Sequence, residues 1–145
     1  MSDAFTVTAA TLTYAGARRA LDAALAAAAE IGGAFNIAVT DAAGRPLAFA
    51  RMDGAFAASG PIAADKAWTV ANFGGLASDA RYAAIAAEPD VRDGILAQPR
   101  VAAFPGGVGI VVDGHLVGAI GASGGSAAQD KLVSAAGAAA VDGVG

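Results

Sequence analysis

The chain has 145 residues, of which 56% are hydrophobic and 15% are charged, and its formal net charge is −4. Lys and Arg form no cluster, which argues against nucleic acid as a partner, because nucleic-acid binding needs a basic stripe. The absence of Cys excludes disulfides and thiolate metal sites, and the single histidine, His115, cannot build a multi-histidine site within one chain. Carboxylates alone can also hold a metal ion, but no EF-hand or HExxH pattern supports such a site, so we predict none.

The length fits a single domain spanning 1–145. The charged share lies below the about 25% of an average soluble domain, so we expect copies of the chain to cover one another in a homo-oligomer. No apolar run approaches the roughly 18 residues of a membrane span, and the N-terminus lacks the basic start of a signal peptide. We therefore expect a cytoplasmic protein without a membrane partner.

The first predicted element is a helix over Thr11–Ile31, which is rich in alanine and leucine and is followed by a double glycine at 32–33. Two short apolar segments, 35–41 and 46–53, follow it. They are separated by Ala-Ala-Gly-Arg, which predicts a hairpin. Along the second strand, alternation places Arg51 on the same face as two apolar side chains, an unusual position for an arginine.

The middle of the chain predicts helices. After a loop at 54–60, Pro61 is placed as the first residue of a helix that reaches Phe73. Ser78 and the pair Glu88-Pro89 mark two further short helical segments.

The last third of the chain returns to strands and closes with a helix. Two apolar runs flank Asp113-Gly114, a dipeptide that is typical of a type I′ hairpin turn. A final helix is predicted over Ser126–Val141. Because hairpins require antiparallel pairing, the order helix, hairpin, helices, hairpin, helix predicts an α+β fold and not a Rossmann fold.

The glycine-rich turn GAIGASGG, residues 118–125, joins a strand to this last helix and has two interpretations. It lacks the spacing of dinucleotide-binding and P-loop motifs. Gly124 and Gly125 can turn the chain while Ser126 and Gln129 form a capping box. The same backbone N–H groups could instead hold an anion, because a helix N-terminus attracts negative charge. We favour the cap.

Three segments together resemble a known family. They are IAVTDAAGRPLAFARMDGA, SGPIAADKAWTVANFG and FPGGVGIVVDGHLVGAIGASGGSAAQDKLVSAAGAAAV. In order, they contain the motifs RMDGA, DKA, PGG, DG, GAIGxSGG and QD. This ordered set is similar to that of the GlcG/HbpS family of haem-degrading-like domains. The resemblance covers nearly the whole chain. It implies a profilin-like domain of α/β/α layers with a five-stranded antiparallel sheet, often assembled into homo-oligomers.

The resemblance also implies a small-ligand-binding protein. Family members are associated with haem, glycolate utilisation and cobalamin chemistry, and a shared fold does not choose among these ligands. Haem or another tetrapyrrole is therefore one candidate cofactor. Haem iron is held by His, Cys, Met or Tyr in most proteins, and this chain offers His115, Met52, Tyr14 and Tyr82. His115 is the candidate haem ligand that we single out, although its place after Asp113-Gly114 predicts an exposed hairpin edge.

The alternative function is a cofactor-free lyase, isomerase or hydrolase acting on a small oxo- or hydroxy-carboxylic acid. Its site would combine Arg51 as the carboxylate anchor with Lys66 or Asp65 as the catalytic base. Glycine amides would stabilise an enolate or oxyanion. The remaining candidate ligand-binding residues are Asp53, Gly106, Gly107, Gly124, Gly125, Gln129 and Asp130.

These charged residues also have a purely structural interpretation. Arg51 could pair with Asp53 or Asp65, and Lys66 with a neighbouring carboxylate, to hold a subunit interface. The sequence leaves the pocket and the structural pairing open, and with them the question of whether the protein is an enzyme.

Overall fold

The computed structural model describes residues 4–142 of the chain. These residues contain five α-helices and one antiparallel sheet of four strands. In chain order the elements are α1 (Tyr14–Glu30), β1 (Asn36–Asp41), β2 (Pro46–Arg51), α2 (Ser59–Asn72), α3 (Ser78–Ile85), α4 (Pro89–Leu96), β3 (Gly107–Val112), β4 (His115–Ser123) and α5 (Ala127–Val141). The predicted α+β class is confirmed.

Local signals set the ends of α1 and of the first hairpin. Helix α1 begins later than predicted because the hydroxyl of Thr13 caps it, accepting a hydrogen bond from Gly16 N at 3.0 Å. In the β1–β2 turn, the carboxylate of Asp41 accepts hydrogen bonds from the backbone N–H of Ala43 and of Arg45, at 2.9 and 3.0 Å. The predicted hairpin is confirmed.

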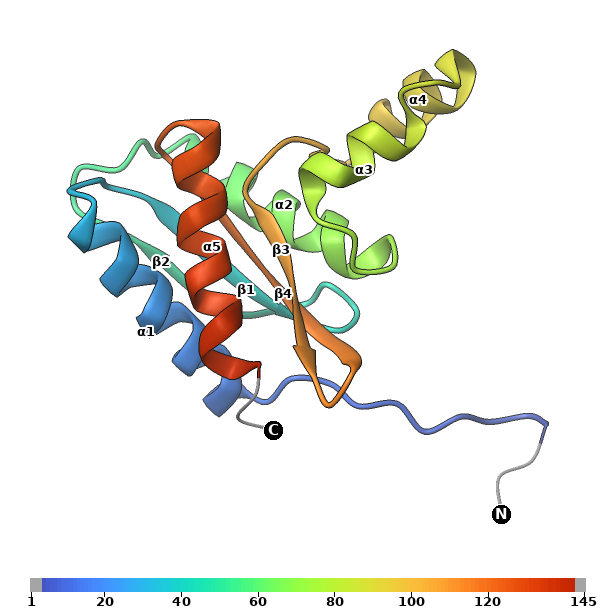
Figure 1. The fold of residues 1–145 in the computed structure, drawn as a ribbon, viewed down its shortest axis with the longest axis horizontal. Coiled ribbons are helices and arrows are strands. Elements are labelled where there is room, and N and C mark those ends of the chain that lie inside the picture. Colours follow the sequence, from blue (N-terminus) through green and yellow to red (C-terminus); the bar gives the residue numbers. More distant parts are fainter. Residues whose placement is uncertain (1–3, 143–145) are drawn as a thin grey trace.

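Helices cover both faces of the sheet, whose strand order is β2-β1-β4-β3. Helices α1 and α5 lie side by side against one face, with α2 against the other (Figure 1). Alternation along each strand divides the side chains between the two layers. Ile37, Val39 and Ile120 pack under α1 and α5, whereas Ala119 packs against α2. The profilin likeness itself stays a prediction.

Glycines allow α2 to approach the sheet closely. A Cβ at Gly121 would collide with the backbone of Ala63 in α2, and one at Gly107 would lie 2.7 Å from the carbonyl oxygen of Lys66. Side chains at these positions would push α2 outward. The glycines therefore bring Lys66 directly over strands β3 and β4.

The second hairpin joins β3 and β4 at the predicted turn. Asp113 and Gly114 both have positive φ, of 52° and 78°, as a type I′ turn requires. The strands pair antiparallel from Gly107 opposite Gly121 to Val112 opposite His115. His115 therefore lies at the exposed end of the hairpin.

The five-stranded sheet implied by the resemblance is wrong for residues 4–142, because they form four strands. The segment before β3 cannot extend the sheet as a regular strand. It contains two prolines, and Arg100 and Gly106 have positive φ of 71° and 130°. The residue-by-residue interpretation had identified the four strands that are present, and the fifth came only from the family resemblance.

The helices between the two hairpins occur where predicted, with one difference. Helix α2 begins at Ser59, so Pro61 is its third residue and not its first. Proline is tolerated there because N–H groups in the first turn have no acceptor within the helix. Helices α3 and α4 extend away from the sheet (Figure 1), and no residue of α4 is buried.

Among the described residues, no helix has both the length and the apolar character needed to cross a membrane.

Candidate functional site

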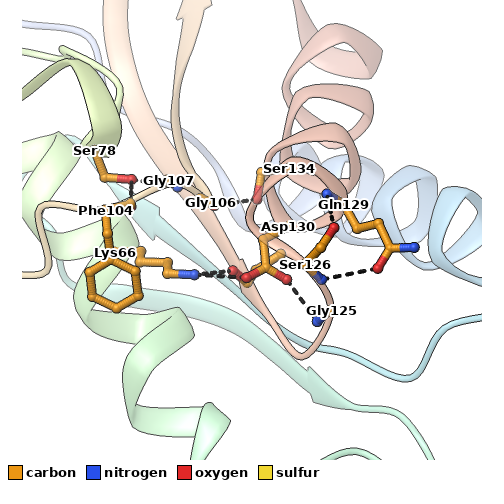
Figure 2. A network of polar contacts seen from close by, with 11 residues as sticks. Lys66, Ser78, Phe104, Gly106, Gly107, Gly125, Ser126, Gln129, Asp130 and Ser134 are labelled. Atoms are coloured by element: carbon orange, nitrogen blue, oxygen red, sulfur yellow. Dashed lines mark hydrogen bonds and ion pairs between the residues drawn. The ribbon is translucent and has the colours of Figure 1, made fainter.

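A buried lysine lies at the junction of α2, α5 and the sheet. The Lys66 side chain is 1% exposed, and its Nζ donates hydrogen bonds to Asp130 Oδ2 at 3.1 Å and to Ala122 O at 3.0 Å (Figure 2). Asp130 lies in the first turn of α5 and is also buried. Lys66 therefore pairs with a carboxylate, as the structural interpretation expected, but the partner is 64 residues away in the same chain and the pair joins α2 to α5, whereas that interpretation placed it at a subunit interface.

Two glycines and a phenylalanine enclose this ion pair. A Cβ at Gly106 would lie 2.7 Å from Lys66 Nζ, so only glycine leaves room for the ammonium. On another side the ring centroid of Phe104 lies 4.7 Å from the same nitrogen, a cation–π contact. Gly125 N donates to Asp130 Oδ1 at 3.0 Å. The ammonium and the carboxylate are thus covered by protein.

Burial lowers the pKa of Lys66, because removing the ammonium from water disfavours its charged form. The hydrogen bond and the negative charge of Asp130 act in the opposite direction and offset part of that effect. A lysine with a lowered pKa can serve as a base or nucleophile if a substrate reaches it. In this structure, however, Lys66 Nζ contacts two protein acceptors, Asp130 Oδ2 and Ala122 O, and an aromatic ring.

The glycine turn before α5 is a helix cap. Ser126 Oγ accepts from Gln129 N at 3.2 Å, and Gln129 Oε1 accepts from Ser126 N at 3.0 Å, which together form the predicted capping box (Figure 2). Gly125 N is bound by the Asp130 carboxylate. The anion at this helix N-terminus is therefore a side chain of the protein itself, and the capping interpretation is confirmed.

The amide of the PGG motif is also used within the fold. Gly107 N donates to Ser78 Oγ at 2.8 Å, and that hydroxyl donates in turn to Phe104 O. Gly106 O accepts from Ser134 Oγ at 2.6 Å. These bonds fix the segment that carries Phe104 over Lys66, and they occupy the Gly107 N–H that was a candidate oxyanion donor.

Asp65 and Lys66 are neighbours in α2 but lie in different environments. Asp65 Oδ1 accepts from Arg100 Nε at 2.9 Å in a partly exposed pair, and the Arg100 guanidinium lies 5.1 Å from the Trp68 ring centroid. Successive helical residues point about 100° apart, so neighbouring positions rarely share one site. Asp65 therefore holds the 100–101 segment against α2.

The structural interpretation paired Arg51 with Asp53 or Asp65 at a subunit interface, and neither pair forms within residues 4–142 of one chain. Arg51 is exposed at the end of β2, and its side chain makes no ion pair or hydrogen bond with another described residue. It lines a hollow of about 470 Å³ together with Phe49 and Asn36. Neither Lys66 nor Asp65 lines that hollow, so Arg51 faces different space from both candidate bases.

A second hollow lies between α3, α4 and the segment before β3. Its volume is about 520 Å³, and it is lined by Asp79, Tyr82, Leu96, Val101, Ala103, Phe104 and Pro105. Phe104 belongs both to this hollow and to the cover over Lys66. His115 does not line this hollow.

Sequence reasoning missed Phe104, Arg100 and Asn36. The available signals were an aromatic residue directly before the Pro-Gly-Gly motif and an asparagine inside the apolar strand segment FNIAVTD. Arg100 carried no signal, because its contact with Asp65 depends on how the 97–106 segment folds back over α2.

A partly exposed ion pair beside the second hollow gives a pH prediction. Asp79 Oδ2 accepts from Lys131 Nζ at 2.7 Å, and this hydrogen bond holds the pKa of Asp79 below its usual 3.8. A lowered folded-state pKa adds stability above pH 3.8 that is lost as the pH falls through the folded pKa. We therefore expect Lys131→Gln to lower the free energy of unfolding by about 0.2–1 kcal/mol at neutral pH and by less in acid.

Urea unfolding of the two proteins across this pH range measures that difference. Arg18→Gln is the control, because Arg18 and its partner Asp22 are both more than half exposed. A Lys131→Gln difference that stays constant down to pH values well below 3.8 would contradict the assignment.

The chain is similar to known proteins over most of its length. A family model described as haem degrading protein HbpS-like matches residues 12–139. A 15.0 kDa protein of Citrobacter freundii, encoded in the dhaT-dhaS intergenic region, is 33% identical over 127 residues, which is 86% of this chain and 87% of that protein.

Two solved structures extend the comparison. The protein ORFY of Klebsiella pneumoniae has a TM-score of 0.87 and 27% identity, with 97% of each chain covered. A complex of PduOC with heme has a TM-score of 0.78 and 27% identity, covering 90% of this chain and 94% of the other. Because the family model spans most of the sequence, the chain belongs to the HbpS-like family.

Proposed function

We propose that the protein binds a tetrapyrrole, with haem as the first candidate, in the hollow between α3, α4 and the segment before β3. The observation that carries the proposal is the lining of this hollow: apart from Asp79 at its edge with α5, it consists of aliphatic and aromatic side chains around one tyrosine, Tyr82. A flat apolar ligand needs such walls, and a phenolate is one of the side chains that hold haem iron. The HbpS-like family and the PduOC:heme neighbour favour the same ligand class.

The other candidate iron ligands fit less well. Met52 is packed against the core, and its sulfur accepts a hydrogen bond from Phe35 N at 3.4 Å. The Tyr14 hydroxyl accepts from Arg18 on the exposed face of α1. His115 is exposed at the β3–β4 turn, where it could hold iron only in a shallow site or between subunits.

The residues around the hollow would hold haem in distinct ways. Phe104 and Leu96 would contact the ring faces, and the Tyr82 hydroxyl would ligate the iron. Lys131 does not line the hollow but is bound to Asp79, which does, and it would share its charge between that carboxylate and a propionate. Bound haem would supply redox or ligand-binding chemistry at the iron, while the protein sets access and polarity.

Haem titration followed by the Soret band tests the proposal. We expect Tyr82→Phe to weaken haem binding by at least about tenfold, because it removes the iron ligand. We expect His115→Ala and Tyr14→Phe to leave the affinity unchanged. Loss of affinity in His115→Ala alone would move the site to the hairpin edge. Unchanged binding in all three variants would overturn both assignments.

The homo-oligomer belongs to this proposal as well. Large apolar side chains are exposed beside the hollow, with Tyr82 at 43%, Leu96 at 38% and Phe104 at 48% exposure. Association through this region would bury them together with the ligand. The enzyme alternative is not part of the proposal, because its anchor Arg51 and its candidate bases Lys66 and Asp65 do not share a hollow.

A further inference from the structure

A separate hollow lies where the edge strand β2 meets the first turn of α2. Its volume is about 470 Å³, and it is lined by Asn36, Phe49, Arg51, Ala57, Gly60, Pro61 and Ala64. None of these residues lines the Tyr82 hollow. Asn36 and Arg51 are directly paired across β1 and β2, so both side chains project from the same face of the sheet, toward α2.

Asn36 carries an unpaired acceptor in this hollow. Its side chain is fully buried, and its Nδ2 donates to Phe56 O at 2.8 Å. Reversing the amide would set two oxygens against each other, so this bond fixes the orientation. Asn36 Oδ1 is then left without a hydrogen-bond partner among the described residues. Buried acceptors are nearly always hydrogen-bonded, so we expect a donor outside the described residues, such as a ligand, to pair with this oxygen.

Arg51 supplies a free cation beside that acceptor. Within residues 4–142 it makes no ion pair, although Asp65 lies in the neighbouring helix, because Asp65 is bound to Arg100. A guanidinium with all its donors free suits a carboxylate, which it can bind through two parallel hydrogen bonds. The first turn of α2 adds the positive end of the helix dipole to the same hollow.

Gly60 leaves the space that a ligand would use. A Cβ at this position would lie 3.5 Å from Asn36 Oδ1 and 3.4 Å from Phe49 Cζ. The Asn36 oxygen is buried, so binding a ligand there requires an outward rotation of the Phe49 ring, which is 52% exposed to solvent. An alanine at position 60 would narrow this space without straining the backbone, because Gly60 does not have a positive φ.

We propose that this hollow binds a small hydroxycarboxylate, whose carboxylate accepts from Arg51 and whose hydroxyl donates to Asn36 Oδ1. The two recognition elements demand different groups, since Arg51 offers only donors and Asn36 Oδ1 is only an acceptor. A simple carboxylate satisfies one of them and a hydroxycarboxylate satisfies both. The site lies apart from the Tyr82 hollow and does not depend on haem binding.

Isothermal titration calorimetry with a matched set of acids tests the proposal. The probes are propionate, 2-hydroxypropionate, 3-hydroxypropionate and alanine, which differ in the donor beside the carboxylate. We expect one hydroxypropionate to bind at least about tenfold more tightly than propionate, because propionate has no donor to pair with the buried acceptor. We expect Arg51→Gln to weaken it by at least about tenfold.

Matched glycine variants separate the site from general effects on the fold. Gly60→Ala should abolish the preference for the hydroxy acid while keeping the thermal stability, since alanine favours a helix. Gly94→Ala is the control, because Gly94 is also in a helix and its added Cβ would meet nothing within 4 Å. We expect it to bind like the unmodified protein.

Several results would overturn the proposal. They are equal affinity for propionate and both hydroxy acids, tighter binding of alanine, unchanged affinity in Arg51→Gln, and no binding up to about 10 mM of any probe. The Tyr82→Phe variant should bind the hydroxy acid normally, so failure of the haem proposal and failure of this one are distinguishable.

Discussion

Replacing Asp130 with alanine is expected to lower the free energy of unfolding by about 3–5 kcal/mol, because it leaves a buried ammonium without its counter-ion. Lys66 is 1% exposed and its Nζ lies 4.7 Å from the Phe104 ring centroid, so its ammonium has little bulk water to replace the lost carboxylate. The Gly125 N–H loses its acceptor in the same variant. Guanidinium chloride unfolding monitored by circular dichroism measures the change.

Two further variants make this expectation specific. Asp65→Ala breaks an ion pair from the adjacent position of α2, but that pair is partly exposed and should cost less than about 1 kcal/mol. Combining Lys66→Met with Asp130→Leu removes both charges together and should recover much of the stability lost in Asp130→Ala. Equal losses of unfolding free energy in Asp130→Ala and Asp65→Ala would show that the buried pair stabilises the fold no more than the partly exposed one.

Replacing Phe35 with alanine is expected to cost about 3–5 kcal/mol, because it deletes a fully buried ring from a packed core. Phe35 also supports the turn before α5. A Cβ at Gly125 would lie 2.8 Å from Phe35 Cε2, and one at Gly124 would lie 3.0 Å from Phe35 Cα. Losing the ring should therefore loosen the turn whose amide binds Asp130 as well as the core itself.

A matched phenylalanine provides the control for this prediction. Phe56 is 70% exposed, and its link to Asn36 runs through its backbone oxygen, so Phe56→Ala should change the free energy of unfolding by less than about 0.5 kcal/mol. Hydrogen exchange at the Gly125 amide gives a second readout, and we expect it to become faster in Phe35→Ala alone. Similar losses in the two variants would contradict the assigned roles.

The buried pair changes what can be said of Lys66 as a functional residue. Lysine and aspartate next to each other in the sequence indicated one site, with either residue as a base. In the structure Lys66 joins α2 to α5, whereas Asp65 fixes the segment that leads to Phe104. Lys66 can react with a ligand only if Phe104 moves, and Phe104 lines the hollow assigned to the tetrapyrrole.

Local sequence features predicted most of the fold. The glycine after α1, the turn before β2, Asp113-Gly114 and the Ser126–Gln129 capping box were all recognisable in the sequence, and all occur. Each of these features depends on backbone conformation or on contacts between residues a few positions apart, which a short stretch of sequence specifies. The fifth strand had no such local signal in the residues and is absent from residues 4–142.

The site depended on contacts that no local pattern specifies. The sequence by itself determined the family, the α+β class and the residues that carry charge. The tertiary structure decided that Lys66 meets Asp130 and that Asp65 meets Arg100. It also left the Arg51 side chain without a partner among residues 4–142, beside a buried Asn36 oxygen. Successive helical residues point about 100° apart, so the sequence neighbours Asp65 and Lys66 face different surroundings. Glycines in the sheet let α2 approach it closely, so Lys66 meets residues that are distant in sequence.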